Sequence, residues 1–187
     1  MKTTWNMKRI LTATLMLAFG VAAAYSQEIP VNTTLSGSGA PSTVNLQTGT
    51  GVSEYSLAGK GTLGQFTLRV VSAGAASPQP SDTCSGLYVP VLAGEGVLRS
   101  QDGSLLKLNL TAGSDCINLA LGQALCIRIF DIIGGTGRFS GASGGTVTLT
   151  MTVAPVVPYK FGFFTVTADM SGTISGIGDQ QDQGEGQ

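Results

Sequence analysis

The segment from residue 134 to 153 has the sequence GGTGRFSGASGGTVTLTMTV, and it decides the fold class. Its first twelve residues contain six glycines. The only bulky side chains among them are Arg138 and Phe139, which we expect to anchor a connection that otherwise consists of small residues. After residue 145, threonines alternate with valine, leucine and methionine, which predicts a β-strand with one buried face. A strand, not a helix, therefore follows the glycine-rich connection.

Three functional motifs nearly match this connection, and each lacks a required group. Residues 135–140 approach the dinucleotide-binding fingerprint, but Ser140 ends it and no helix follows to hold a pyrophosphate. Residues 141–145 match the G-x-S-x-G nucleophile elbow, but the chain has no histidine to activate the serine. A calcium-binding nonapeptide begins similarly at 134, but Phe139 stands where a carboxylate is needed. We interpret the segment as a structural connection between strands.

The same period of two recurs along the chain. Residues 53–60, 64–72 and 163–174 alternate, and 96–100 with 104–111 suggests a hairpin followed by a turn at 112–115. In 124–133 both faces are mostly apolar, which predicts a strand covered on both sides. The expected interior residues are Leu106, Leu108, Leu110, Val147, Leu149, Met151, Phe164 and Val166.

The amino terminus has the features of a secretory signal peptide. Three basic residues precede an apolar run at 10–24, which is short for a membrane span. We favour cleavage after Ser26, with Ala24 as the alternative. The expected organisation is a signal peptide at 1–26, one domain at 27–176 and a disordered polar tail at 177–187, so the protein should be secreted, with no membrane span after the signal is removed.

Composition limits the classes of partner and cofactor. The mature chain keeps seven basic and eleven acidic residues, so its net charge is 7 − 11 = −4, which argues against a polyanionic partner such as nucleic acid. Glycine and threonine abundance favours an all-β domain. Three cysteines without histidine argue against a zinc site, and we expect neither a metal nor another cofactor.

The three cysteines differ in their surroundings. Cys84 and Cys116 have turn-like neighbours, whereas Cys126 lies in an apolar strand. In an oxidising compartment we expect Cys84 to pair with Cys116 and Cys126 to remain a buried thiol. Pairing of Cys116 with Cys126 across a hairpin is the main alternative.

About eight antiparallel strands with one apolar face can form a sandwich or a closed barrel. The strings GGTGRFSGASGGTVTLT, FTVTADMSGTISG and GTLGQFTL resemble bacterial secreted relatives of the allene oxide cyclase and dirigent barrels. The resemblance covers residues 35–176 and implies an eight-stranded antiparallel barrel, sometimes trimeric, whose lumen holds a hydrophobic small molecule. No catalytic residue of those families can be assigned here. The residues that would line such a ligand are Phe66, Leu68, Leu108, Leu149, Met151, Phe164, Val166 and Met170. For the methionines and phenylalanines among them, packing in the core is the default interpretation.

Asp131 and Arg138 are the weak candidates for catalysis. Asp131 shares a strand face with Leu125 and Ile127, and if that face lines the lumen, its carboxylate lies at the barrel mouth. Arg138 could pair with it. The alternatives are a turn-stabilising aspartate and an exposed surface arginine.

Two classes of function remain after these exclusions. The first is a secreted module that binds a hydrophobic ligand or serves as a structural barrel, and the residue set favours it over catalysis. The second is a cofactor-independent isomerase or cyclase. A convergent polar pair in a deep lumen would favour the enzyme, and a lumen filled by side chains the structural role.

Overall fold

The computed structural model describes residues 28–43, 49–156 and 162–177. The predicted signal peptide and residues 178–187 of the predicted tail lie outside these ranges. Ile177, which we expected to begin the tail, packs against the core instead. In the described part of the chain, no helix has the length and hydropathy that crossing a bilayer requires.

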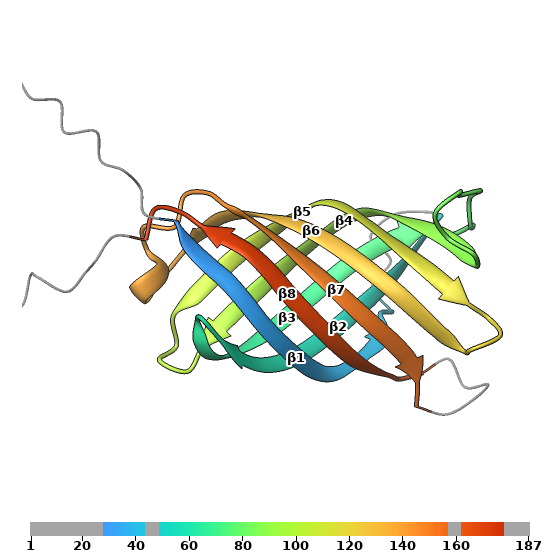
Figure 1. Cartoon of the computed structure of the whole chain (residues 1–187), viewed down its shortest axis with the longest axis horizontal. Helices are drawn as coiled ribbons and strands as arrows, with labels where there is room; N and C mark the ends of the chain where they lie inside the picture. The colour runs from blue at the N-terminus through green and yellow to red at the C-terminus, as the bar shows by residue number, and fades with distance from the viewer. Residues whose placement is uncertain (1–27, 44–48, 157–161, 178–187) are drawn as a thin grey trace, which may run out of the picture.

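Eight antiparallel strands form a closed barrel (Figure 1). Each strand pairs with the next along the chain, and β8 returns to pair with β1. The predicted eight-stranded antiparallel barrel is confirmed, and the sandwich alternative is wrong. The strands are β1 (Ile29–Pro41), β2 (Thr50–Gly61), β3 (Gly64–Ala75), β4 (Leu87–Ser100), β5 (Leu105–Asn118), β6 (Gln123–Gly135), β7 (Thr146–Pro155) and β8 (Phe164–Ile174).

The two ends of the barrel differ in their connections. We call one the glycine end, where the connection between β6 and β7 lies beside the start of β1 and the finish of β8 (Figure 1). We call the other the disulfide end, where residues 76–86 join β3 to β4 and residues 119–122 join β5 to β6.

The alternating pattern places apolar side chains inside the barrel and threonines outside. Val147, Leu149 and Met151 of β7 are at most 1% exposed, while Thr146 and Thr152 are exposed. Of the eight residues predicted inside, six are buried, and Leu110 and Phe164 are partly buried against the same core.

Strand β6 corrects one prediction. Its inner face carries Cys126, Arg128, Phe130 and Ile132, and the opposite face points outward. Because that outer face is only partly covered, with Leu125 at 49% exposed, the expectation of cover on both sides is wrong.

Strand β5 corrects a second prediction. The expected turn at residues 112–115 is absent, because β5 continues to Asn118. The pairing register with β6 shifts between Leu110 and Ala112, and beyond the shift Asp115 lies opposite Cys126. Directly opposed residues of an antiparallel pair share a face, so Asp115 points into the barrel.

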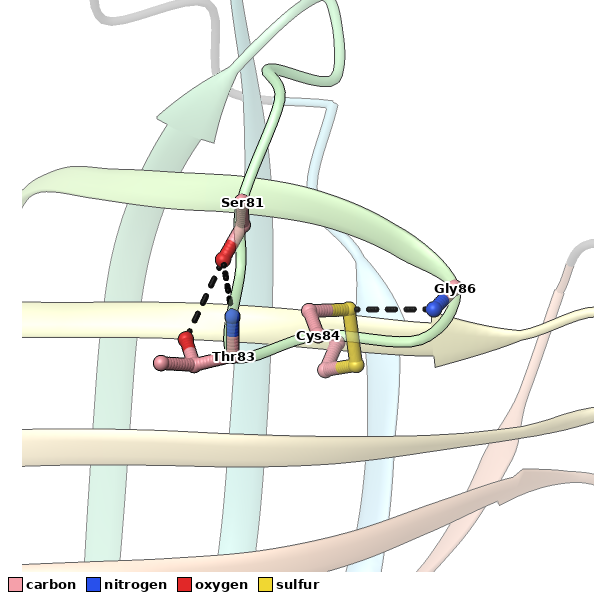
Figure 2. Close-up of a disulfide and its surroundings, with 5 residues drawn as sticks. Ser81, Thr83, Cys84 and Gly86 are labelled. Atoms are coloured by element: carbon pink, nitrogen blue, oxygen red, sulfur yellow. Dashed lines mark hydrogen bonds between the residues drawn. A yellow bond between two sulfur atoms is a disulfide. The ribbon is translucent and has the colours of Figure 1, made fainter.

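The predicted disulfide is confirmed. Cys84 in the β3–β4 connection is bonded to Cys116 of β5, and Cys126 is a buried free thiol. Figure 2 shows the connection beside the barrel wall, where the amide of Gly86 donates to the Cys84 sulfur at 3.4 Å. Cys116 lies opposite Leu125, one position from Cys126, so the two cysteines face opposite sides and the alternative pairing is excluded.

The glycine-rich connection closes the glycine end. Its 3₁₀ turn η1 (Gly137–Phe139) places Phe139 in the core at 2% exposed. Gly137 has φ = 58°, and a β-carbon there would clash with the Ser104 side chain, so this position strongly favours glycine. Arg138 donates hydrogen bonds to the Leu63 carbonyl and the Ser100 hydroxyl. Both bulky residues therefore anchor the connection, as predicted.

Candidate functional site

An ion pair lies inside the barrel toward the disulfide end. The guanidinium of Arg128 on β6 is 2.7 Å from the carboxylate of Asp115 on β5. The arginine side chain is 1% exposed and that of the aspartate 20%, so Asp115 is the member that solvent reaches.

Additional polar groups hold the Arg128 guanidinium in place. Its Nε donates to the Ser72 hydroxyl at 3.3 Å, and one terminal nitrogen donates to the Ser114 and Ile127 carbonyls at 3.1 and 2.9 Å. Gly113, opposite Arg128 in the register, provides room, because a β-carbon there would lie 3.1 Å from Arg128 Cδ. The cationic side chain thus has a fixed position in the lumen.

The protonation states of this cluster follow from its burial. Burial alone would lower the pKa of Arg128, but its hydrogen bond and attraction to Asp115 more than compensate and raise it. Burial raises the pKa of Tyr55, and the negative charge of Asp115 adds to the effect. Burial and the Asp115 charge also raise the pKa of Cys126. At neutral pH the cluster therefore contains a guanidinium, a neutral phenol and a neutral thiol.

The lumen toward the glycine end is filled by apolar side chains. The small space among them has no room for a water molecule. Its lining residues are Val31, Leu63, Leu98, Leu106, Leu108, Val147, Met170 and Ile174. A ligand therefore has no path to the polar cluster through this filled part of the lumen.

The structure separates the two residues proposed for catalysis. Asp131 is exposed on the outer face of β6, where it accepts a hydrogen bond from Thr146 at 3.0 Å. Arg138 lies at the glycine end, 3.7 Å from the carboxylate of Asp102. The expected Asp131–Arg138 pair and the lumenal position of Asp131 are wrong, since the opposite face of β6 points inward.

The residues predicted to line a ligand are distributed along the lumen. Seven of the eight are buried, and Phe164 is partly buried. Leu108 and Met170 line the filled space, whereas Met151 is opposite Cys126 and Val166 lies near the disulfide end of β8. Leu149 and Met151 are the register partners of Arg128 and Cys126, so these two lie beside the polar cluster.

Sequence reasoning missed both members of the ion pair. Residues 112–115, Ala-Gly-Ser-Asp, have the composition of a turn, which hides the inward position of Asp115. The pattern around Arg128 indicates only that it shares a strand face with Cys126 and Phe130. A signal for the inward position of Arg128 is present in the neighbouring strand. The inner face of β7 is unambiguous, and its residues Met151 and Leu149 are the register partners of Cys126 and Arg128.

The donor set does not fit a metal ion. Among the residues that the structure describes, no three histidine, cysteine or carboxylate side chains are grouped to bind one. In the cluster, Asp115 is already paired with a guanidinium, which would repel a cation.

Fold and site define a closed antiparallel β-barrel with a charged pair in its lumen. No protein-family model matches this chain, and no curated protein matches it. Among solved structures, a pterocarpan synthase dirigent protein is similar, with 13% sequence identity and a TM-score of 0.42. The match covers 81% of this chain and 97% of that chain.

Proposed function

We propose that the protein is a secreted binding module that holds a mainly apolar small molecule at the disulfide end of its barrel. The observation that carries this proposal is the Asp115–Arg128 pair, of which Asp115 is partly exposed and Arg128 is buried. The carboxylate would accept a hydrogen bond from the polar group of the ligand, and apolar side chains exposed at that end, such as Leu119 and Leu121, would contact its body.

A purely structural barrel accounts less well for the ion pair. Replacing a buried ion pair by apolar residues is often neutral or stabilising, so the pair is not needed for a stable core. The filled apolar half already supplies a core at the glycine end. The disulfide between Cys84 and Cys116 fits the oxidising compartment that secretion implies.

An isomerase or cyclase is the second candidate. Its supporting observation is that a partly exposed carboxylate lies in the same cluster as the Tyr55 phenol, which burial keeps protonated at neutral pH. Such a pair offers a base and an acid without a cofactor. Substrate turnover that is lost in Asp115→Asn would favour this candidate over simple binding.

The binding proposal is tested with N-phenyl-1-naphthylamine, a fluorescent apolar amine with one N–H donor. We expect saturable one-to-one binding by the mature protein and a loss of about tenfold or more in affinity in Asp115→Asn, because a hydrogen bond to a charged group is removed. Asp131→Asn is the matched control, since it makes the same chemical change on the outer face.

Folding of each variant is verified by circular dichroism at the temperature of the titration. Absence of saturable binding by the wild-type protein, or equal affinities of the two variants, would contradict the proposal and favour a structural barrel. If binding is saturable and depends on Asp115, mass spectrometry of molecules that copurify with the native protein will identify the chemical class of the bound ligand.

A further inference from the structure

The basic residues of the barrel are unevenly distributed over its surface. Six lie in the described ranges, and of these Arg128 is buried and Arg138 anchors the glycine end. The remaining four are exposed on the outer faces of four consecutive strands, one on each of β2, β3, β4 and β5. They are Lys60, Arg69, Arg99 and Lys107, and we call them the basic face.

The pairing register brings these four side chains together. Arg69 and Lys107 both lie opposite Val97, one on each side of β4. Arg99 is two positions along β4 from Val97 and therefore points to the same side. Lys60 lies opposite Gln65 at the glycine end of the same surface. The four cations thus follow one another across adjacent strands.

The basic face has no ion-pair partners among the described residues. The two ion pairs of those ranges involve Arg128 and Arg138 instead. The next row toward the disulfide end carries carboxylates: Glu54 lies opposite Val71 and Val71 opposite Glu95, and the row continues through Asn109 to Asp131. The cations and the carboxylates therefore occupy neighbouring rows of the outer wall, although the mature chain is acidic overall.

A hollow lies at the glycine end of the basic face. It has a volume of about 690 Å³ and is open to solvent. Its lining combines the cations Lys60 and Arg99 with the amides Gln65 and Gln101 and the hydroxyl of Thr67. Such a surface offers charge-assisted hydrogen bonds to anionic groups and neutral hydrogen bonds to hydroxyl groups.

We propose that the basic face is a binding site for an acidic polysaccharide. The ligand would place carboxylate or sulfate groups against the four cations and sugar hydroxyls against the amides of the hollow. Phe66, the one aromatic residue of the hollow, is 4% exposed, so the surface lacks the stacking platform typical of single-stranded nucleic-acid sites. This site is on the outer wall and is independent of the lumenal cluster.

The test measures binding of polygalacturonate and heparin to the mature protein, with dextran as the uncharged polymer. We expect both acidic polymers to bind, more weakly as salt increases, and dextran not to bind. The double variant Arg99→Gln/Lys107→Gln should weaken binding about 2- to 30-fold, the typical range for two exposed charge contacts.

A charge-matched control separates local contacts from net charge. Thr152→Glu/Ser171→Glu also lowers the net charge by two, at exposed positions of β7 and β8, and should leave the affinity within about twofold. The pair Lys60→Gln/Arg69→Gln repeats the test if the first double variant does not fold. Melting curves confirm that each variant is folded.

Three results would overturn the proposal. The first is no binding of either acidic polysaccharide, and the second is an equal loss of affinity in the control variant. The third is tighter binding of oligothymidylate than of both acidic polysaccharides, which would identify a nucleic-acid surface. Retained binding of N-phenyl-1-naphthylamine in the basic-face variants would show that the lumenal site is unaffected.

Discussion

Replacing Asp115 with Asn leaves the buried guanidinium of Arg128 without its counter-charge. Removing one partner of a fully buried ion pair typically costs about 3–5 kcal/mol. Asp115 is 20% exposed, and the carbonyl of Asn can still accept a hydrogen bond, so both effects reduce the cost here. We expect a loss of about 2–3 kcal/mol in the free energy of unfolding, which lowers the melting temperature by about 5–10 °C in a domain of this size.

The measurement is equilibrium denaturation in guanidinium chloride, with thermal melts followed by circular dichroism. Asp131→Asn makes the same change on the outer face and should alter stability by about 0.5 kcal/mol or less. The double variant Asp115→Leu/Arg128→Met removes both charges and should be about as stable as the wild-type protein.

Two results would contradict this interpretation of the ion pair. The first is a loss below about 1 kcal/mol in Asp115→Asn, the typical net value of one hydrogen bond, because Arg128 would then not depend on the Asp115 charge. The second is a double variant less stable than Asp115→Asn alone, because the pair would then be essential to the core.

Other changes test the remaining features of the barrel. Replacing Cys84 and Cys116 with Ser opens a loop of sequence separation 32 and should cost about 3–4 kcal/mol in denaturant titrations, and an unchanged midpoint would contradict this. Burial raises the pKa of the Cys126 thiol above its ordinary value of 9.0. The free energy of unfolding that the neutral thiol contributes should therefore be fully present below pH 9.0 and be lost as the pH rises above it. Cys126→Ala should flatten that decline, and melts at increasing pH will determine whether it does. Leu149→Ala, at a fully buried position, should cost about 2–5 kcal/mol. The outward-facing Thr150→Ala should cost less than about 1 kcal/mol, and equal losses would mean that the faces of β7 are assigned wrongly.

The sequence was sufficient to predict the fold wherever one face of a strand differed chemically from the other. The threonine alternation of β7 fixed its orientation, and the turn-like surroundings of Cys84 identified its disulfide. The site was not predictable in this way. Strand β6 has apolar residues on both faces, so its inward face depends on pairing with β7, and choosing the other face exchanges Arg128 for Asp131.

The register shift in β5 was equally hidden. Residues 111–114 have the composition of a turn, but in the structure they continue the strand past the irregularity and carry Asp115 into the lumen. An average over the chain also does not report that four cations share one face of the barrel. Both features depend on the arrangement of strands, which local patterns do not determine.

The closing pair of the barrel has a consequence for how the protein reaches its folded state. Ile29 at the start of β1 lies opposite Ile174 at the end of β8, a separation of 174 − 29 = 145 residues. A chain synthesised or exported from its amino terminus therefore holds β1 with one unpaired edge until its last strand is available. Contacts between such distant residues slow folding, and open strand edges favour aggregation in the interval. Closure protects the finished barrel from edge-to-edge association. Before closure, the incomplete chain avoids aggregation only if β8 becomes available quickly to pair with β1.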